Sequence, residues 1–122
     1  MKTLGIGMVG ARYGARMHLA NYAKLKAKGI DTIACMAVND AFVMGAWGRE
    51  QGTDGKIRML ADGSADYTKA LGLEFDLSAR GLGLRCQRFS MLVDDGVVKA
   101  LNIEGPGKFE VSDAETMVRQ LG

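Results

Sequence analysis

Histidine, proline and cysteine are scarce in this sequence, and each shortage narrows the classes of site it can hold. The one histidine, His18, would have to serve a metal site or a serine–histidine–aspartate triad without a second imidazole. The single proline, Pro106, lies in a Gly-Pro-Gly stretch, so no proline-rich linker divides the chain. We therefore expect no metal site and one domain spanning residues 1–122.

Long apolar runs and a strong charge of one sign are also missing. The longest apolar stretches, such as 4–9 and 33–38, are far shorter than the roughly 20 residues that span a bilayer. The formal net charge is +2, with basic and acidic residues interspersed, so we expect neither a membrane segment nor a nucleic-acid partner. The two cysteines, Cys35 and Cys86, are far apart, and eight methionines suit a reducing compartment. We expect a cytoplasmic protein.

Strand and helix patterns alternate along the first part of the chain. Residues 2–9 and 31–38 are apolar runs typical of strands that are covered on both faces in a parallel sheet. Residues 13–28 between them carry a helical stripe that ends at Gly29. This order predicts a strand–helix–strand unit whose two strands lie side by side.

Shorter elements follow. Asp40 can cap a helix that continues to Gln51, a third strand covers 57–61, and Ser64 can cap a brief helix. Residues 72–83 show little periodicity and are therefore predicted to form a surface loop.

The C-terminal part predicts a hairpin and a last helix. The β-rich runs 88–93 and 97–103 flank an Asp-Asp-Gly turn, and residues 112–115 match a capping box at the start of a helix that ends near Leu121. The whole pattern indicates an α/β three-layer sandwich with a mixed sheet.

Several short sequence motifs between about residue 24 and residue 122 occur in the order and spacing of one known family. They lie at 25–35, 38–48, 60–63, 70–73 and 88–99. In these motifs the chain resembles a bacterial peroxiredoxin of the type-five subfamily, a thioredoxin-fold thiol peroxidase. The resemblance implies a thioredoxin-like fold, an active-site arginine at Arg88, and a homodimer that pairs through segments like the one containing Phe42 and Trp47.

One part of the family pattern is absent. The family places its peroxidatic cysteine in a Pro-x-x-x-Thr-x-x-Cys turn, whereas residues 10–16 read Gly-Ala-Arg-Tyr-Gly-Ala-Arg. Because the attacking group in peroxide reduction is a thiolate, we expect this chain to lack ordinary peroxidase turnover.

Residues 1–25 have a different likeness. The strand, glycine turn and helix start over 5–18 resemble the opening of the glucose-fructose oxidoreductase and inositol dehydrogenase family, which is nicotinamide-dependent. We therefore expect a chimera, with a Rossmann-like first strand and helix over 1–25 joined to a peroxiredoxin-like segment over 26–122.

The turn after the first strand carries the binding alternative, a dinucleotide or phosphate site. Free N–H groups at a helix N-terminus attract phosphate, and Asp40 could hold a ribose hydroxyl, although a helix cap explains it equally well. If the chain is a peroxiredoxin-like protein without peroxidase turnover, we expect no cofactor. If the turn binds a dinucleotide, we expect the cofactor to be NAD or NADP. Its candidate residues are Gly10, Arg12, Gly14, Ala15 and Asp40.

The two cysteines give the enzymatic alternative. Cys35 lies in an apolar strand and is interpreted as a buried core residue. Cys86 lies between Arg85 and Arg88, whose charges could favour its thiolate, so Cys86 with Arg88 is the candidate pair for a residual thiol oxidoreductase.

Overall fold

The computed structural model of this chain describes residues 4–6, 22–53, 55–105, 108 and 110–122, the first of these ranges by its backbone. The predicted strand over 2–9 therefore lies partly outside the described residues, and so does the first part of the helix predicted over 13–28. The whole of the predicted nucleotide turn over 10–16 lies outside them.

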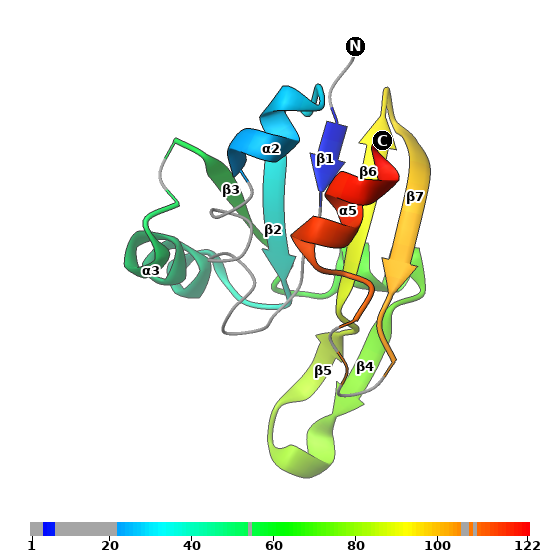
Figure 1. The fold of residues 1–122 in the computed structure, drawn as a ribbon. Coiled ribbons are helices and arrows are strands. Elements are labelled where there is room, and N and C mark those ends of the chain that lie inside the picture. The colour runs from blue at the N-terminus through cyan, green and yellow to red at the C-terminus, as the bar shows by residue number, and fades with distance from the viewer. Residues whose placement is uncertain (1–3, 7–21, 54, 106–107, 109) are drawn as a thin grey trace.

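Five strands form the central layer. Strand β2 (Ile33–Ala37) pairs in parallel with β3 (Ile57–Ala61), while β6 (Phe89–Asp94) pairs antiparallel with both β1 (Leu4–Ile6) and β7 (Val97–Ile103). Strand β1 lies between β2 and β6 and contacts both (Figure 1). The strands therefore follow the order β3-β2-β1-β6-β7 in one layer, in which the parallel pair β2-β3 lies beside the antiparallel sheet β1-β6-β7. This arrangement has the expected mixture of strand directions, with the first two strands side by side.

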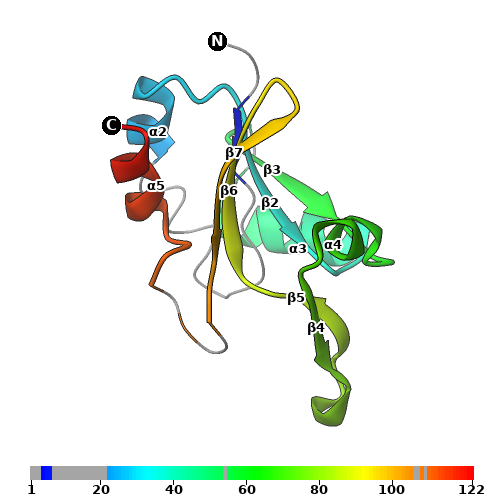
Figure 2. The ribbon, with the colours of Figure 1, turned by 90° about the vertical axis from the view of Figure 1, so that its right-hand side faces the viewer.

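Helices cover both faces of this sheet. Helices α2 (Tyr22–Ala27) and α5 (Ala114–Gln120) lie on one side, and α3 (Ala41–Gln51) and α4 (Asp66–Leu71) lie on the other (Figure 2). A three-layer sandwich results, as the sequence predicted.

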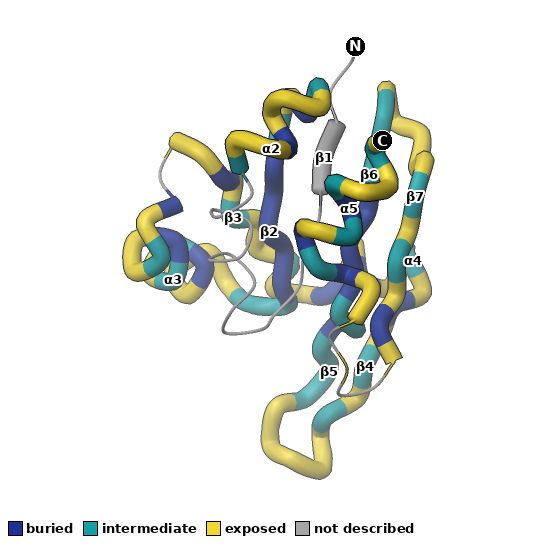
Figure 3. The backbone as a smooth tube through the Cα atoms, in the orientation of Figure 1, coloured by how far each residue is buried: buried dark blue, intermediate teal, exposed yellow. Residues whose placement is uncertain are grey.

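The core has one part on each face of the sheet. Leu25 of α2 and Met117 of α5 pack with Cys35 in one cluster, and Met44 of α3 packs with Met36 in the other. Strand β2 supplies residues to both clusters and is buried along its whole length (Figure 3). Its continuous apolar sequence reflects this burial on two sides.

Helix α3 begins and ends where the sequence predicted. The Asp40 carboxylate accepts a hydrogen bond from the Val43 N–H at 2.8 Å, which satisfies one of the unpaired donors of the first turn. Gly52 ends the helix with a left-handed backbone, φ +68°, and its N–H bonds to the Arg49 carbonyl oxygen.

The predicted caps of the two later helices were wrong by a few residues. Ser64 does not cap α4; instead, the Asp62 carboxylate accepts from the N–H groups of Tyr67 and Thr68 at 3.1 and 2.8 Å. Ser112 does not cap α5 either, because its hydroxyl donates to a buried glutamate, and Asp113 accepts from Thr116 N instead. A charged carboxylate is the stronger acceptor for these N–H groups.

The predicted hairpin over 88–103 is confirmed, with Asp95 (φ +51°) and Gly96 (φ +80°) as its turn. The predicted loop over 72–83 is wrong. These residues form much of a second hairpin, in which β4 (Glu74–Leu77) and β5 (Gly83–Cys86) pair on either side of a short 3-10 helix, η1 (Ser78–Arg80). The hairpin projects away from the sandwich and its tip is exposed (Figure 3).

Candidate functional site

A cavity of about 570 Å³ opens where the second hairpin meets the central sheet. Its walls come from the C-terminal end of β2, the β4–β5 hairpin, the two residues between β5 and β6, and residues that follow β7. One part of the lining is apolar, and the rest carries cations, a carboxylate and a thiol. The apolar lining comprises Ala37, Val38, Phe75, Leu77 and Leu82, and the polar and remaining lining comprises Asn39, Arg85, Cys86, Gln87, Arg88, Glu104, Gly105 and Lys108.

Arg85 joins two walls of the cavity. Its Nη1 donates to the Val38 carbonyl oxygen at 3.0 Å and to Asn39 Oδ1 at 2.9 Å, while its Nε donates to the Leu82 carbonyl oxygen at 2.7 Å. All three acceptors are neutral oxygens, so these bonds hold the hairpin against the end of β2 without neutralising the guanidinium charge. No local sequence pattern indicates this role, because two of the three partners, Val38 and Asn39, lie nearly fifty positions away along the chain.

Arg88 and Glu104 also line the cavity, and their backbones are bonded to each other. The Glu104 N–H donates to the Arg88 carbonyl oxygen at 2.9 Å, and the Arg88 guanidinium makes a long hydrogen bond of 3.5 Å to the Lys108 carbonyl oxygen. The structure therefore places Arg88, the residue that the resemblance singled out, in the cavity. Glu104 and Lys108 line it too, and no sequence motif had indicated either residue.

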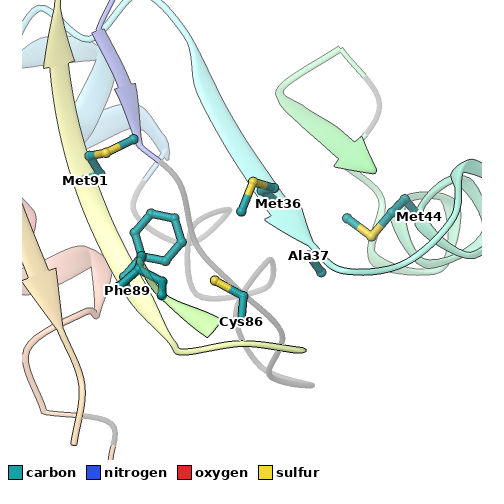
Figure 4. Close-up of a cluster of buried hydrophobic side chains, with 7 residues drawn as sticks. Met36, Ala37, Met44, Cys86, Phe89 and Met91 are labelled. Carbon is teal, nitrogen blue, oxygen red and sulfur yellow. The ribbon is translucent and has the colours of Figure 1, made fainter. Parts of the chain in front are cut away.

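Cys86 also lines the cavity, but its surroundings favour the protonated thiol. The side chain is 7% exposed and packs beside Phe89 (Figure 4). Burial is the largest influence on its pKa and raises it; a hydrogen bond with Thr68 opposes this, and the negative charges of Asp62 and Glu74 add to it. The expectation that Arg85 and Arg88 would favour the thiolate is thus not met, because burial and the two carboxylates raise the pKa and neither arginine is among its causes.

Cys35 is confirmed as a core residue. It is 0% exposed, it packs in the cluster that contains Leu25 and Met117, and burial raises its pKa to about 12. A thiol in this position is protonated at neutral pH and is shielded from reagents in solution.

The residues of the nucleotide alternative are not brought together by the described part of the structure. Gly10, Arg12, Gly14 and Ala15 lie outside it, and the Asp40 carboxylate caps α3, as the helix-cap interpretation of that residue predicted. Within the described residues, no cluster of three or more histidine, cysteine, aspartate or glutamate side chains could hold a metal ion. No helix in these ranges has the length and hydropathy needed to cross a bilayer.

The layers and the strand order define a thioredoxin-like fold. Together with the arginine in the cavity, they are typical of a peroxiredoxin. The family model described as Redoxin matches residues 14–118, and the chain belongs to this family of peroxiredoxins. The match begins inside the segment 1–25, so peroxiredoxin likeness extends further toward the N-terminus than the expected junction near residue 24.

Relatives and solved structures agree with this assignment. The chain is 49% identical over 100 residues to Peroxiredoxin-2E, chloroplastic, of Arabidopsis thaliana, which covers 80% of this chain and 43% of that protein. It is 48% identical to reduced Prx3 from Vibrio vulnificus, with a TM-score of 0.90 over 98% of this chain and 80% of that one. Peroxiredoxin 5 from Alvinella pompejana gives 35% identity and a TM-score of 0.83, over 98% and 77% of the two chains.

The share of each relative that this chain covers, and the names of those relatives, bear on function and location. The chain spans about half the length of the curated relatives it matches, from 43% of Peroxiredoxin-2E to 60% of Peroxiredoxin-2B of the same plant. These matches give no support to a separate Rossmann-like segment over 1–25. Peroxiredoxin-2E is a chloroplastic protein, so a cytoplasmic location of this chain stays a prediction.

Proposed function

We propose that this chain retains the peroxiredoxin scaffold and its arginine-lined cavity without turning over peroxide through a peroxidatic thiol. The observation that carries the proposal is the state of its two cysteines: both side chains are buried, and the pKa of each thiol is raised. Peroxide is attacked by a thiolate, and both environments oppose thiolate formation.

The size of the rise in thiol pKa decides whether peroxide reduction by these cysteines is slow or rapid. A thiol with the pKa of Cys35, about 12, is ionised in roughly one molecule in a hundred thousand at pH 7. Peroxiredoxin chemistry instead depends on a thiol whose pKa is depressed, and the turn at 10–16, where the family carries that thiol, contains no cysteine. The cavity can therefore accept a ligand, but it lacks a poised nucleophile.

The test is stopped-flow consumption of hydrogen peroxide by metal-free protein supplied with a dithiol reductant. We expect a rate close to that of the reductant alone, unchanged in the Cys35→Ala and Cys86→Ser variants. Rapid consumption that survives both substitutions, or disappears in one, would overturn the proposal.

The second candidate is a residual thiol oxidoreductase through Cys86 and Arg88. Its support is that both residues line the same cavity, so a peroxide bound near Arg88 would lie close to the thiol. Slow peroxide consumption that is lost in Cys86→Ser and weakened in Arg88→Lys is the expected result for this candidate. Consumption that Cys86→Ser does not change would dispose of it.

The origin and ligand of residues 1–25 also remain proposals. A chimeric junction is supported by the turn sequence alone, and a dinucleotide site there would bind NAD or NADP through Gly10, Arg12 and the N–H groups near Ala15. Calorimetric titration with either nucleotide tests the site directly. Absence of heat at millimolar ligand would exclude it.

We also propose a homodimer that pairs through the start of α3. Phe42, in the first turn of this helix, is 87% exposed, which is unusual for a large apolar side chain in a monomer. Sedimentation velocity of the protein and of Phe42→Ser is the test. A concentration-dependent dimer that Phe42→Ser converts to monomer is expected, and a monomer at all concentrations would contradict the proposal.

A further inference from the structure

Glu104 is the first residue after β7, and its carboxylate is among the most heavily bonded groups in the described part of the chain. The side chain is 5% exposed. Its Oε2 accepts hydrogen bonds from three consecutive backbone N–H groups, those of Glu110, Val111 and Ser112, at 2.8, 2.9 and 2.8 Å. The Ser112 hydroxyl donates a further bond of 2.7 Å to the same oxygen.

These four donors make a site for an anion that the chain fills with its own side chain. Consecutive N–H groups converging on one point favour negative charge there, and hydrogen bonds to an ionised acceptor are stronger than those to a neutral one. The low pKa of Glu104, held at about 2 by these donors against the opposing effect of burial, agrees with a carboxylate that stays ionised. Glu104 therefore fixes where residues 110–112 lie.

The same residue is bonded to the cavity. Its backbone N–H donates to the Arg88 carbonyl oxygen, and the Arg88 guanidinium reaches the carbonyl oxygen of Lys108, which lies between Glu104 and the three N–H groups along the chain. Lys108 itself is held by a bond from its N–H to the Gly105 carbonyl oxygen at 3.0 Å. Glu104, Gly105, Lys108 and Arg88 all line the cavity.

We infer that Glu104 is a positioning residue for Arg88: by anchoring both ends of the loop after β7, its carboxylate fixes the wall against which the guanidinium group is held. The inference rests on the proposed function only in taking the cavity as the site. It assigns no contact between Glu104 and a ligand.

The experiment follows the Nε–Hε signal of the Arg88 guanidinium group by NMR, with the signal assigned by its disappearance in Arg88→Lys. Three variants loosen the anchor in graded steps: Ser112→Ala removes one of the four donors, Glu104→Gln removes the charge, and Glu104→Ala removes the acceptor. We expect the Arg88 signal to move progressively along this series. Hydrogen exchange at Nε is expected to become roughly tenfold faster in Glu104→Ala, the equivalent of one lost hydrogen bond.

Formate provides the readout that a merely structural role would not give. In Glu104→Ala, added formate can occupy the vacated donors and is expected to return the Arg88 signal toward its wild-type position. The wild-type signal should not respond in this way, because Glu104 already occupies the donors. Glu104→Asp, with a shorter arm, is expected to fall between wild type and Glu104→Gln.

Gly48→Ala is the matched control, because it disturbs the contact between α3 and β3 instead of the cavity. It is expected to lower stability while leaving the Arg88 signal in place. If Ser112→Ala and Glu104→Gln lower stability and the Arg88 signal coincides with that of wild type, the inference is overturned. The Ser112→Ala comparison applies even where the Glu104 variants fail to fold.

The two proposals fail separately. Rapid peroxide turnover would overturn the proposed function and leave the Arg88 signal series unaffected. An unmoved Arg88 signal would overturn the positioning role of Glu104 while the thiols remained buried and protonated.

Discussion

The side-chain amides of Asn102 and Gln120 exchange two hydrogen bonds, of 2.9 and 2.8 Å, and so join strand β7 to helix α5. Asn102 Nδ2 also donates to the Ser90 hydroxyl oxygen at 3.0 Å, and Ser90 is fully buried on the neighbouring strand β6. The last helix is thus held to the sheet by a polar link as well as by the packing of Met117 in the core beneath it.

Removing Asn102 should cost more stability than removing Gln120. Asn102→Ala deletes both bonds to the helix and leaves the buried Ser90 hydroxyl without this donor, a loss of about 1–2 kcal/mol. Gln120→Ala leaves an exposed site that water can satisfy, and about 0.5 kcal/mol is expected. Urea unfolding of both single variants and of the double variant measures the difference. Equal effects of the two single substitutions would contradict the special role of Ser90.

Two glycines of helix α3 should respond to alanine in opposite directions. A Cβ atom on Gly48 would lie 2.8 Å from Met59 Cγ and 3.0 Å from Thr53 Oγ1, so Gly48→Ala forces α3 away from β3. A Cβ on Gly45 would meet the Arg49 side chain at 3.4 Å, an end that can move. We expect Gly48→Ala to lower the free energy of unfolding by about 1–3 kcal/mol and Gly45→Ala to raise it by up to about 1 kcal/mol.

Thermal and urea unfolding of the two alanine variants at one pH provide the measurement. A Gly48→Ala protein as stable as wild type would show that β3 shifts without cost. That result would also remove Gly48→Ala as the control for Arg88.

Local patterns in the sequence were enough to predict the strands and helices with strong signals. The strand predicted over 31–38, the helix from Asp40 to Gly52 and the turn at Asp95-Gly96 each depend on neighbouring residues. The structure has all three, with the strand shortened to 33–37. The strands β4 and β5 were missed, because four residues each give too short a periodic signal and the outward-facing Glu74 and Asp76 look like loop residues.

The site could be predicted only in part, for a different reason. Arg88 was found through the family resemblance and Cys86 through its neighbouring arginines, yet burial decides the protonation of that thiol and cannot be read from adjacent residues. Glu104 gave no signal at all, because its four donors belong to residues 6 to 8 positions further along the chain and no sequence pattern links them to it. Acidic residues near Ser112 instead suggested a capping box.

Glu104 should make stability depend on pH in the acid range. Its pKa is about 2 in the folded protein against an ordinary value of 4.5, so the unfolded chain binds the proton more tightly. The stabilisation is therefore fully present above the ordinary value and is lost as the pH falls toward 2. At pH 7 we expect Glu104→Gln to be about 2–3 kcal/mol less stable than wild type, and this difference should shrink between pH 4.5 and pH 2.

Urea unfolding of both proteins across the acid range tests this dependence, and subtracting one curve from the other cancels the contribution of Asp62. That correction matters because the pKa of Asp62 is also lowered in the fold, where the Thr68 hydroxyl and the N–H groups of α4 oppose burial. A difference between wild type and Glu104→Gln that stays constant down to pH 2 would contradict the assigned pKa.

The two thiols should differ in reactivity with an aromatic disulfide reagent. Cys35 is inaccessible in the folded protein, so it should react at the rate of global unfolding, whereas Cys86 lines the cavity and should react sooner. Because the pKa of Cys86 is raised, its rate should still be climbing above pH 9, the ordinary value for a thiol.

The measurement is the absorbance of the released thiolate, recorded from pH 7 to pH 10, with Cys86→Ser to assign the faster phase. Wild type should release one equivalent in that phase and the second only when denaturant is added, while Cys86→Ser should lose the first phase alone. A fast phase that reaches its full rate below pH 8 would show that Cys86 is a poised thiolate. Such a result would favour the second candidate function, a thiol oxidoreductase that uses Cys86 and Arg88, over the proposal that the chain does not turn over peroxide.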